Sequence, residues 1–279
     1  MNTHPLVVSG NLSDALLKSI EQTLNGNLTQ NTNNLAKIKV DETLSKDTLI
    51  SLRKVFDCDF NQLPESFSPN DVGLVISDMD STFIAIECID EIADFANIKP
   101  QISEITESAM RGEIDFETSL KKRVALLKDL DTSALDQVFN ERLQLNPGSA
   151  ELVKGLHQQS IPFAIVSGGF TFFTDKLKAA HNMAYAKSNT LEIIDNKLTG
   201  NVLGNVVDGQ AKADYLEQLC QELNIQTNQV ISMGDGANDL LMMDKAGLSV
   251  GYCAKPIVQK KADIVINYSG LDLVLELIH

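Results

Sequence analysis

The sequence predicts an α/β protein built on a parallel sheet, with a helical insertion and a small N-terminal α+β domain. From Gly73 onward, apolar strands alternate with helices, a pattern typical of parallel sheets. A charged, helix-dominated segment interrupts this alternation from about Ile86 to Leu145. Polar clusters follow several strands directly, and such sheets bind ligands beyond the carboxyl ends of their strands. We therefore expect these clusters to meet at one edge of the sheet.

Length and charge limit the classes of function. The 279 residues exceed a typical domain of roughly 100–200 residues, so one large or two unequal domains are expected. The apolar fraction of 43% is ordinary for a globular protein. A net charge of −15 argues against binding to nucleic acid or to an anionic membrane, because both need a basic surface. A small anionic substrate stays open, since a local pocket can oppose the overall sign.

The cysteines and the apolar runs indicate a soluble, cytoplasmic protein. Four cysteines are scattered without a CxxC pair, which favours reduced thiols over a disulfide framework or a zinc site. The first residues lack a basic segment followed by a long apolar stretch. No apolar run reaches the length of a membrane span. The sequence leaves open whether the chain works as a monomer or as a homodimer.

Residues 1–70 are expected to form a separate α+β domain without a catalytic motif. Helices are predicted after Ser13 and after Ser45, which are plausible caps. "HPLVVSG" and "AKIKV" read as strands, and "NGNLTQNTNN" reads as a polar loop. A linker with two prolines is expected at 61–71, and the larger domain then covers 71–279.

The larger domain begins with the apolar strand "GLVISD". After the helical insertion, helices are expected in "PGSAELVKGLHQQ" and "TFFTDKLKAAH", on either side of the strand "IPFAIVSGG". The last part of the chain predicts the strand "NQVISMGDGAND", the helix "LLMMDKAG" and the strands "LSVGYCAK" and "ADIVINY". This order supports a parallel sheet with helical connections.

Two aspartates, Asp78 and Asp80, stand at the end of the first of these strands. In isolation, such a pair is also common in turns. A calcium loop is excluded, because its sixth position needs glycine and its twelfth needs glutamate, and Phe83 and Ile89 occupy these positions. Side chains at i and i+2 of an extended segment point the same way. Both carboxylates can therefore reach one group.

Further polar residues follow later strands or stand alone. Ser167 and Gly168 form a turn that can hold phosphoryl oxygens, whereas Lys212 by itself is more typical of a solvated surface. The segment "MGDGANDLL" is not a dinucleotide-binding loop, since Asp239 stands where the last glycine belongs. Together, carboxylates, a hydroxyl, an amine and glycines after strands of one sheet are the parts of a magnesium-dependent phosphoryl-transfer site.

The motifs and their order resemble the phosphoserine phosphatases of the haloacid dehalogenase superfamily. The segments that carry the resemblance lie within about residues 74–267: "DMDSTFIAIECIDEIA", "FETSLKKRVALLK", "VSGGF", "GDGANDLLMM" and "YCAKP". The resemblance implies a Rossmann-like core with a helical cap inserted at about 86–145. Residues 1–70 fall outside the resemblance. Their predicted α+β structure is compatible with the ACT-like domain that bacterial members often carry.

The resemblance also implies an activity. It is the Mg²⁺-dependent hydrolysis of O-phosphoserine through an aspartyl-phosphate, the last step of serine biosynthesis. Asp78 would be the nucleophile, and Asp80 would be the acid and base. The metal would be held by the Asp78 carboxylate, the Asp80 backbone carbonyl and the Asp235 carboxylate.

The remaining roles implied by the resemblance concern the substrate. The phosphoryl oxygens would be bound by Ser167, Gly168 and Lys212. Asn238 would contact the substrate and, with Asp239, support the metal and the lysine. In the cap, Glu87 would bind the ammonium and Arg123 the carboxylate of phosphoserine, and Met110 and Phe116 would help to close the pocket.

The cap segment offers a second interpretation of Arg123. Phe116, Leu120, Val124 and Leu127 share one helical face, and Arg123 borders it. An arginine at such an edge commonly extends to solvent. Lys122 is expected to point nearly the opposite way.

Two other functions remain as alternatives. One is a related enzyme that acts on phosphohomoserine or another small phosphate ester, or that transfers the phosphoryl group. The other is an amino-acid-sensing protein whose phosphatase part is idle. The complete set of Asp78, Asp80, Lys212 and Asp235 speaks against an idle site, because binding alone needs no nucleophile with its own acid.

Overall fold

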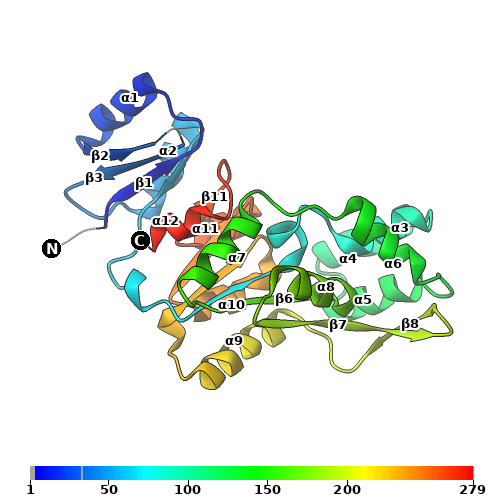
Figure 1. Ribbon diagram of the computed structural model, residues 1–279. Coiled ribbons are helices and arrows are strands. Elements are labelled where there is room, and N and C mark those ends of the chain that lie inside the picture. Colours follow the sequence, from blue (N-terminus) through cyan, green and yellow to red (C-terminus); the bar gives the residue numbers. More distant parts are fainter. Residues whose placement is uncertain (1–3, 33, 279) are drawn as a thin grey trace.

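The computed structural model describes residues 4–32 and 34–278 of the chain. Over these residues a seven-stranded sheet forms the core and a four-stranded sheet forms an N-terminal unit. The N-terminal unit lies at one end of the molecule and the helical cap at the other (Figure 1). The α/β class, the inserted helices and the N-terminal α+β unit agree with the predictions from the sequence.

The N-terminal unit is an antiparallel sheet of order β2-β3-β1-β4, with both helices packed against one face through a shared apolar cluster. Ser13 and Ser45 cap these helices as predicted, and each side chain accepts a hydrogen bond from a backbone N–H of the first turn. The elements are β1 (Leu6–Ser9), α1 (Asp14–Leu24), β2 (Asn27–Asn31), β3 (Leu35–Lys39), α2 (Lys46–Phe56) and β4 (Asp59–Asn61).

The polar segment after α1 differs from the prediction. It was expected to be a loop, but Asn27–Asn31 forms strand β2. This strand lies at the edge of the sheet, pairs only with β3 and is largely exposed. An exposed edge strand carries polar residues, so the apolar alternation that identifies a strand in a sequence is missing here.

The core sheet has the order β11-β10-β9-β5-β6-β7-β8, and all neighbours are parallel except β7 and β8. Strand β5 is central and fully buried; Val75 packs on one face, and Leu74 and Ile76 pack on the other. The strands are β5 (Leu74–Ser77), β6 (Phe163–Phe170), β7 (Tyr185–Ile194), β8 (Lys197–Leu203), β9 (Val230–Gly234), β10 (Leu248–Tyr252) and β11 (Ile264–Ile266).

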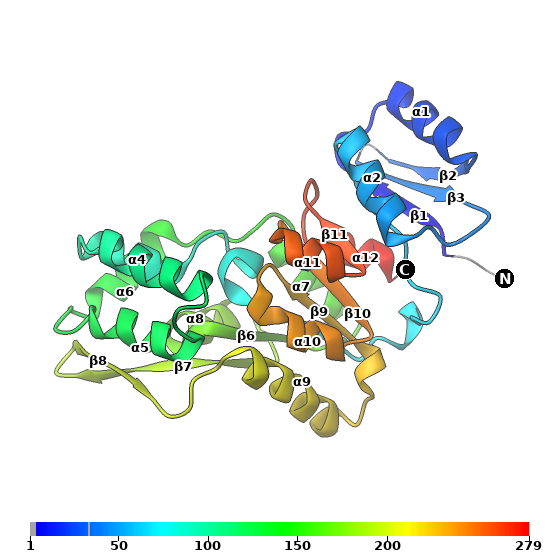
Figure 2. The same ribbon diagram turned by 180° about the vertical axis from the view of Figure 1, so that it is seen from behind.

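Helices cover both faces of the core sheet. One face packs against α7 (Ser149–Gln158), α8 (Thr171–His181) and α12 (Leu273–Leu277). The other face packs against α9 (Gly209–Leu223), α10 (Leu240–Lys245) and α11 (Pro256–Lys261), which come forward when the molecule is seen from behind (Figure 2). The carboxyl ends of β5, β6 and β9 therefore open between two helical layers, where the sequence placed the polar clusters.

The cap consists of α3 (Cys88–Phe95), α4 (Lys99–Met110), α5 (Phe116–Ala125) and α6 (Ser133–Gln137), within the predicted segment. The chain enters and leaves it side by side, because Ile84 and Leu145 form an antiparallel bridge. The β7–β8 hairpin, which the sequence analysis left unassigned, braces the cap. Backbone hydrogen bonds join Asp129 N to Leu198 O at 2.8 Å and Leu198 N to Leu130 O at 2.9 Å.

Two side chains of β4 attach the N-terminal unit to the edge of the core sheet. The Asp59 carboxylate accepts hydrogen bonds from the backbone N–H groups of residues 267, 268 and 269 at 2.7, 3.0 and 3.0 Å. The Asn61 amide pairs with both the carbonyl and the N–H of Val265, each at 2.9 Å. Asn61 thus bonds backbone groups of β11, the edge strand, as a neighbouring strand would.

The segment that joins the two units is packed. Leu63 and Phe67 are buried, and they belong to the same apolar cluster as Val7 of the N-terminal unit and Val75 of the core. The expected linker position at 61–71 therefore coincides with a segment whose apolar side chains cover the core.

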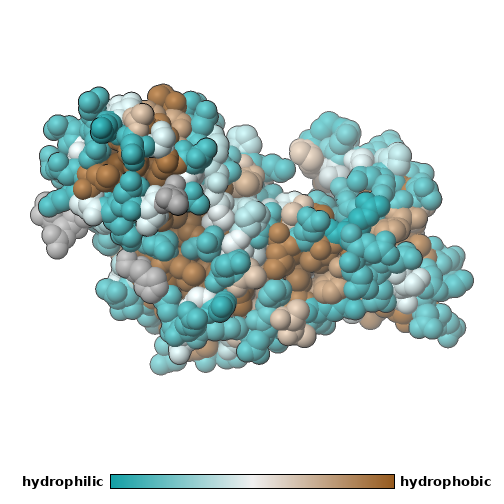
Figure 3. All heavy atoms as spheres, turned by 45° about the horizontal axis from the view of Figure 1, so that its top comes forward, coloured by the Kyte–Doolittle hydropathy of each residue, from teal (hydrophilic) through white to brown (hydrophobic). Residues whose placement is uncertain are grey.

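The surface is mainly hydrophilic. In the view of Figure 3, apolar side chains gather in separate patches between hydrophilic ones. Across the described part of the chain, no helix is both long enough and apolar enough to cross a membrane.

We expect the larger domain to fold without the N-terminal unit, provided that Leu63 and Phe67 are kept. A truncated chain that begins at Gln62 should be more stable than one that begins at Pro69. Each buried side chain of this size contributes about 1.5–3 kcal/mol, so the free energies of unfolding should differ by about 2 kcal/mol or more. Urea denaturation followed by circular dichroism measures this difference. Equal stability of the two truncated chains would show that the segment does not support the core.

Candidate active site at the carboxyl edge of the core sheet

Asp78 follows the last residue of β5, and its backbone is fixed by the neighbouring strand. Its N–H donates to the carbonyl of Met233 in β9 at 2.9 Å. One carboxylate oxygen, Oδ1, accepts a hydrogen bond from Met79 N at 2.7 Å, and the side chain is buried. The chain then turns sharply, with Ser81 at a φ of 56°, in a region that few residues other than glycine adopt. The predicted strand-end position of the first aspartate is confirmed.

Asp80 lies beside Asp78 and in contact with the glycine turn after β6. Its Oδ1 accepts a hydrogen bond from Cys88 N at 3.1 Å. A Cβ atom placed on Gly169 would lie 2.6 Å from the other oxygen, Oδ2. Gly169 therefore leaves the space that this carboxylate occupies. Burial raises the pKa of Asp80 to about 7, and the nearby charge of Glu87 adds to the effect.

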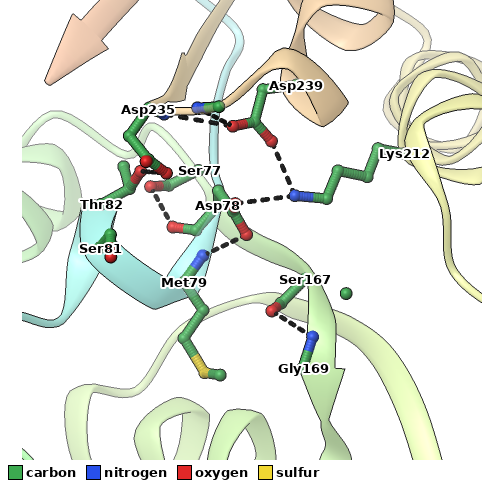
Figure 4. Close-up of polar contacts among 12 residues, drawn as sticks. Ser77, Asp78, Met79, Ser81, Thr82, Ser167, Gly169, Lys212, Asp235 and Asp239 are labelled. Carbon is green, nitrogen blue, oxygen red and sulfur yellow. Dashed lines mark hydrogen bonds and ion pairs between the residues drawn. The ribbon is translucent and has the colours of Figure 1, made fainter. Parts of the chain in front are cut away.

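Lys212 is buried and bridges two carboxylates (Figure 4). Its Nζ lies 2.9 Å from Asp78 Oδ2 and 2.7 Å from Asp239 Oδ1. Burial alone would lower the pKa of this lysine, but Asp239 and Asp78 outweigh burial and raise it above its usual value. The lysine is therefore a fixed positive charge next to Asp78, not a solvated surface residue.

Asp239 holds the turn after β9 in shape. Its Oδ2 accepts hydrogen bonds from the N–H groups of Asp235 and Gly236 at 3.1 and 3.0 Å, and its Oδ1 binds Lys212. Both oxygens thus already have protein partners. Asp239 therefore links Lys212 to the backbone of this turn.

Three carboxylates gather here, and Lys212 pairs with two of them. Single oxygens of Asp78, Asp235 and Asp239 lie within 4.8 Å of one another. Burial, together with the charge of Asp239, raises the pKa of Asp235 to about 6. Burial and Asp239 likewise raise the pKa of Asp78, despite Lys212. An oxygen-only cluster with excess negative charge suits a hard cation, so the residues present fit a metal site.

Ser167, Gly168 and Gly169 occupy the end of β6 opposite these carboxylates. The hydroxyl oxygen of Ser167 accepts a hydrogen bond from Gly169 N at 2.8 Å (Figure 4). A Cβ on Gly168 would lie 2.8 Å from Cζ of Phe116. The cap aromatic therefore rests directly on the backbone of this turn.

A cavity of ≈ 680 Å³ lies between the core and the cap. Both predicted catalytic carboxylates, Asp78 and Asp80, open into it. All residues predicted to contact the substrate line this cavity except Lys212. Lys212 contacts Asp78, which does line it. Those that line it are Glu87, Met110, Phe116, Arg123, Ser167, Gly168 and Asn238.

The cap wall carries charge next to an apolar surface. Leu120, Val124 and Leu127 are buried as predicted, whereas Arg123 faces the cavity and Lys122 faces solvent. Burial lowers the pKa of Arg123, although Asp90 and Glu87 oppose this effect. The Nε of Arg123 is buried and has no hydrogen-bond partner within the described residues. A buried N–H group without an acceptor lowers the stability of the folded protein.

Met110 lies at the rim of the cavity. Its side chain is 78% exposed and does not seal the opening in this structure. Glu87 accepts a hydrogen bond from Ser81 Oγ at 2.6 Å, and this contact holds the carboxylate at the cavity wall.

The sequence analysis missed Ser119 and Lys255, which line the cavity, and gave Gly169 of the predicted Ser-Gly-Gly turn no role of its own. Ser119 lies one turn before Arg123 and has a buried hydroxyl without a partner among the described residues. Gly169 leaves room for Asp80. Lys255 follows β10, and its N–H donates to the carbonyl of Asp235 at 2.8 Å. Lys255 could have been identified from the sequence, because it is a polar residue just after a predicted strand.

Comparison with known proteins agrees with this geometry. The sequence profile of the haloacid dehalogenase-like hydrolases matches residues 72–247. The phosphoserine phosphatase of Polaromonas sp. is 49% identical over 214 residues, which cover 75% of this chain and 91% of that protein.

Solved structures give the same relation. A HAD-family hydrolase of Salmonella enterica serovar Typhi superimposes with a TM-score of 0.92 at 34% identity, over 99% of this chain and 98% of that one. A phospho-aspartyl intermediate analogue of phosphoserine phosphatase superimposes with a TM-score of 0.69 at 40% identity, over 75% of this chain and 99% of that one. The chain therefore belongs to the haloacid dehalogenase superfamily and, within it, to the phosphoserine phosphatases.

Proposed function

We propose that the chain hydrolyses O-phospho-L-serine to L-serine and phosphate through an aspartyl-phosphate on Asp78, with Mg²⁺ as cofactor, as the last step of serine biosynthesis. One observation carries the proposal. Asp78 is held against the cation Lys212, while Asp80, beside it, has a pKa raised to about 7. Two neighbouring carboxylates in different surroundings, of which only Asp78 is paired with a cation, can divide the roles of nucleophile and acid.

In the first step, an oxygen of the Asp78 carboxylate attacks phosphorus. The bond between phosphorus and the seryl oxygen breaks, and the seryl oxygen takes the electron pair. Asp80 gives its proton to this oxygen, so serine leaves as a neutral alcohol. A carboxyl group with a pKa near 7 is well suited to hold a proton at neutral pH and to release it in the reaction.

In the second step, water hydrolyses the aspartyl-phosphate. Asp80, now ionised, takes a proton from the water as the water oxygen attacks phosphorus. The bond between phosphorus and the Asp78 oxygen breaks, which restores the carboxylate and releases phosphate. Each step thus uses the same pair of side chains.

The phosphoryl oxygens need donors that are already in place. Ser167 and Gly168 line the cavity, Lys212 lies 2.9 Å from Asp78, and Asn238 lies in the cavity wall on the β9 side. Because these groups sit on strand ends and on a helix, they need little rearrangement when charge develops on the phosphoryl group.

The metal would be held by the carboxylates of Asp78 and Asp235 and by the backbone carbonyl of Asp80. Asp239 is the less suitable ligand, because its two oxygens already bind Lys212 and two backbone N–H groups. When bound, Mg²⁺ would offset the repulsion between the anionic substrate and the carboxylates.

The cap supplies the contacts to the amino-acid end. We assign the carboxylate of phosphoserine to Arg123, whose buried Nε lacks an acceptor in the described residues, and the ammonium to Glu87. Phe116 covers the phosphoryl-binding turn, and Met110 at the rim would close over the substrate.

The cellular location and the domain roles follow from the same proposal. The cysteines Cys58, Cys88, Cys220 and Cys253 are free thiols, as is usual for cytoplasmic proteins, and we place the reaction in the cytoplasm. We assign catalysis to residues 71–279, with the cap at about 86–145. We assign regulation or assembly to the ACT-like unit of residues 1–70.

Asp78→Asn should abolish turnover and leave the fold intact, because the amide nearly preserves the shape of the side chain but does not attack phosphorus. Asp80→Asn should slow the reaction, and least for esters with good leaving groups, since these need little protonation. Phosphate release from phosphoserine and from p-nitrophenyl phosphate, with circular dichroism as a control of folding, measures both effects. Substantial turnover by Asp78→Asn, or equal losses on both esters in Asp80→Asn, would contradict the assigned roles.

Asp235→Asn should weaken the binding of Mg²⁺, because one of its two carboxylate ligands is lost. We expect the Mg²⁺ concentration at half-maximal activity to rise about 10-fold or more. The increase in unfolding temperature on addition of Mg²⁺ should shrink in parallel, and this readout does not depend on turnover. Asp244→Asn, a change on the exposed side of α10, is the matched control. An unchanged response to Mg²⁺ would remove Asp235 from the ligand set.

Specificity should depend on Glu87 and Arg123. Removing one partner of a desolvated charge pair costs about 2–5 kcal/mol, or roughly 30-fold to several thousand-fold in kcat/KM. Glu87→Ala and Arg123→Ala should therefore lower kcat/KM for phosphoserine far more than for p-nitrophenyl phosphate, which lacks both charged groups. Lys122→Ala, next to Arg123 but facing solvent, should leave both substrates unchanged.

The ratio of the two kcat/KM values is the quantity to compare. If it stays at the wild-type value in both variants, the enzyme is a phosphatase of this fold with another substrate. Including phosphohomoserine in the assay tests the alternative ester that the sequence left open.

A further inference from the structure

The phosphoryl-binding turn is a bulge in the core sheet. The parallel ladder between β6 and β7 pairs Val166 with Lys187 and then Phe170 with Asn189. Three residues of β6 thus stand opposite a single residue of β7. A bulge of this kind interrupts the ladder and leaves backbone groups in need of other partners.

Asn189 supplies the missing partner with its side chain. Its Nδ2 donates to the carbonyl of Gly168 at 2.8 Å, and its Oδ1 accepts from the N–H of Val207 at 2.8 Å. The side chain is 1% exposed and does not line the cavity. Its orientation is unambiguous, because a backbone N–H can only donate and a carbonyl can only accept.

The contact to Gly168 fixes one peptide plane at both ends. The carbonyl of Gly168 and the N–H of Gly169 belong to the same planar group. Asn189 binds the carbonyl, and Ser167 Oγ accepts from the N–H at 2.8 Å (Figure 4). Because Ser167 Oγ serves as an acceptor within the turn, its own proton is free to point into the cavity.

The contact to Val207 reaches the segment that carries Lys212. Val207 is followed by Asp208, whose side chain caps α9 by accepting from Ala211 N at 2.8 Å. The carbonyl of Asp208 accepts from Lys212 N at 3.0 Å. Lys212 therefore lies one turn beyond Asp208, the residue that follows the one bound by Asn189.

We propose that Asn189 is a positioning residue for the phosphoryl group, because it joins the turn that carries Ser167 and Gly168 to the start of the helix that carries Lys212. It sets the relative placement of these phosphoryl-binding groups from behind the site, without touching the substrate. The inference rests on the proposed phosphatase function and adds a residue that none of the predicted motifs contains.

The test exchanges the donor of Asn189 for an acceptor. Asn189→Asp keeps the shape of the side chain and the acceptor for Val207, but turns a carboxylate oxygen toward the carbonyl of Gly168. We expect kcat/KM to fall about 10- to 100-fold, as for partners that orient a ligand from behind a site. The loss should be similar for phosphoserine and for p-nitrophenyl phosphate, since both carry the same phosphoryl group.

Binding of inorganic phosphate gives a readout without turnover. Its dissociation constant, measured by calorimetry in the presence of Mg²⁺, should rise in Asn189→Asp. Asn196→Asp makes the same chemical change at the exposed turn of the β7–β8 hairpin and should leave both the rates and the phosphate affinity unchanged. Asn189→Ala removes the donor without adding charge, and it serves as the second variant if the aspartate variant does not fold.

A double mutant separates positioning from a general loss of stability. If Asn189 acts through the turn, Ser167→Ala combined with Asn189→Ala should cost less than the product of the two single effects. The inference is overturned if both Asn189 variants unfold at lower temperature while kcat/KM and phosphate affinity stay within about 2-fold of wild type. It is also overturned if only phosphoserine is affected.

Failure of the proposed function would look different. If the wild-type protein hydrolysed p-nitrophenyl phosphate but not phosphoserine, phosphoserine would not be the substrate. The effect of the Asn189 variants could then still be measured with p-nitrophenyl phosphate. If the wild-type protein hydrolysed neither ester, the phosphate affinity of the Asn189 variants would still test the inference.

Discussion

The buried ammonium group of Lys212 determines how the active-site carboxylates are arranged. It binds Asp78 and Asp239 at 2.9 and 2.7 Å, because charges removed from water must be paired. Asp239 is further satisfied by two backbone N–H groups of the turn after β9. Together with Asp235, these carboxylates form an oxygen-only cluster with excess negative charge, which suits a divalent cation.

The charged groups of the active site must be held rigidly, and the order of strands in the sheet provides this. Asp78 and Asp235 follow β5 and β9, and Ser167 lies in the second half of β6; these are adjacent strands at the centre of the sheet. The cap is inserted directly after the turn that follows β5, and its two ends are paired at Ile84 and Leu145. In the proposed reaction, the chemistry of the phosphoryl group depends on the carboxyl ends of strands, and recognition of the amino-acid end depends on cap helices that the β7–β8 hairpin supports. We therefore expect substitutions in the cap to alter specificity without removing the catalytic groups.

The sequence predicts the parts of the site that depend on local order. Carboxylates after an apolar strand, such as Asp78 and Asp235, fall on the carboxyl edge of any parallel sheet, and capping serines mark the two N-terminal helices. The sequence cannot predict features set by strand register. The position of Asn189 opposite the bulge depends on how β6 pairs with β7, and the clearance between Gly169 and Asp80 depends on how β5 lies beside β6. Strand β2 escaped notice because an exposed edge needs no apolar face.

The N-terminal unit contributes support to the site without contributing a reactive group. Lys46 donates to the carbonyl of Lys261 at 2.6 Å and to Asp263 at 2.9 Å, at the end of α11. The start of the same helix is held by Lys255 N, which donates to the carbonyl of Asp235. The unit therefore fastens the far end of a short helix whose near end borders the carboxylate cluster. The phosphoserine phosphatase structure that is matched over 99% of its length by 75% of this chain leaves a quarter of the chain without a counterpart there, as expected if this support adds to a catalytic domain that is already complete.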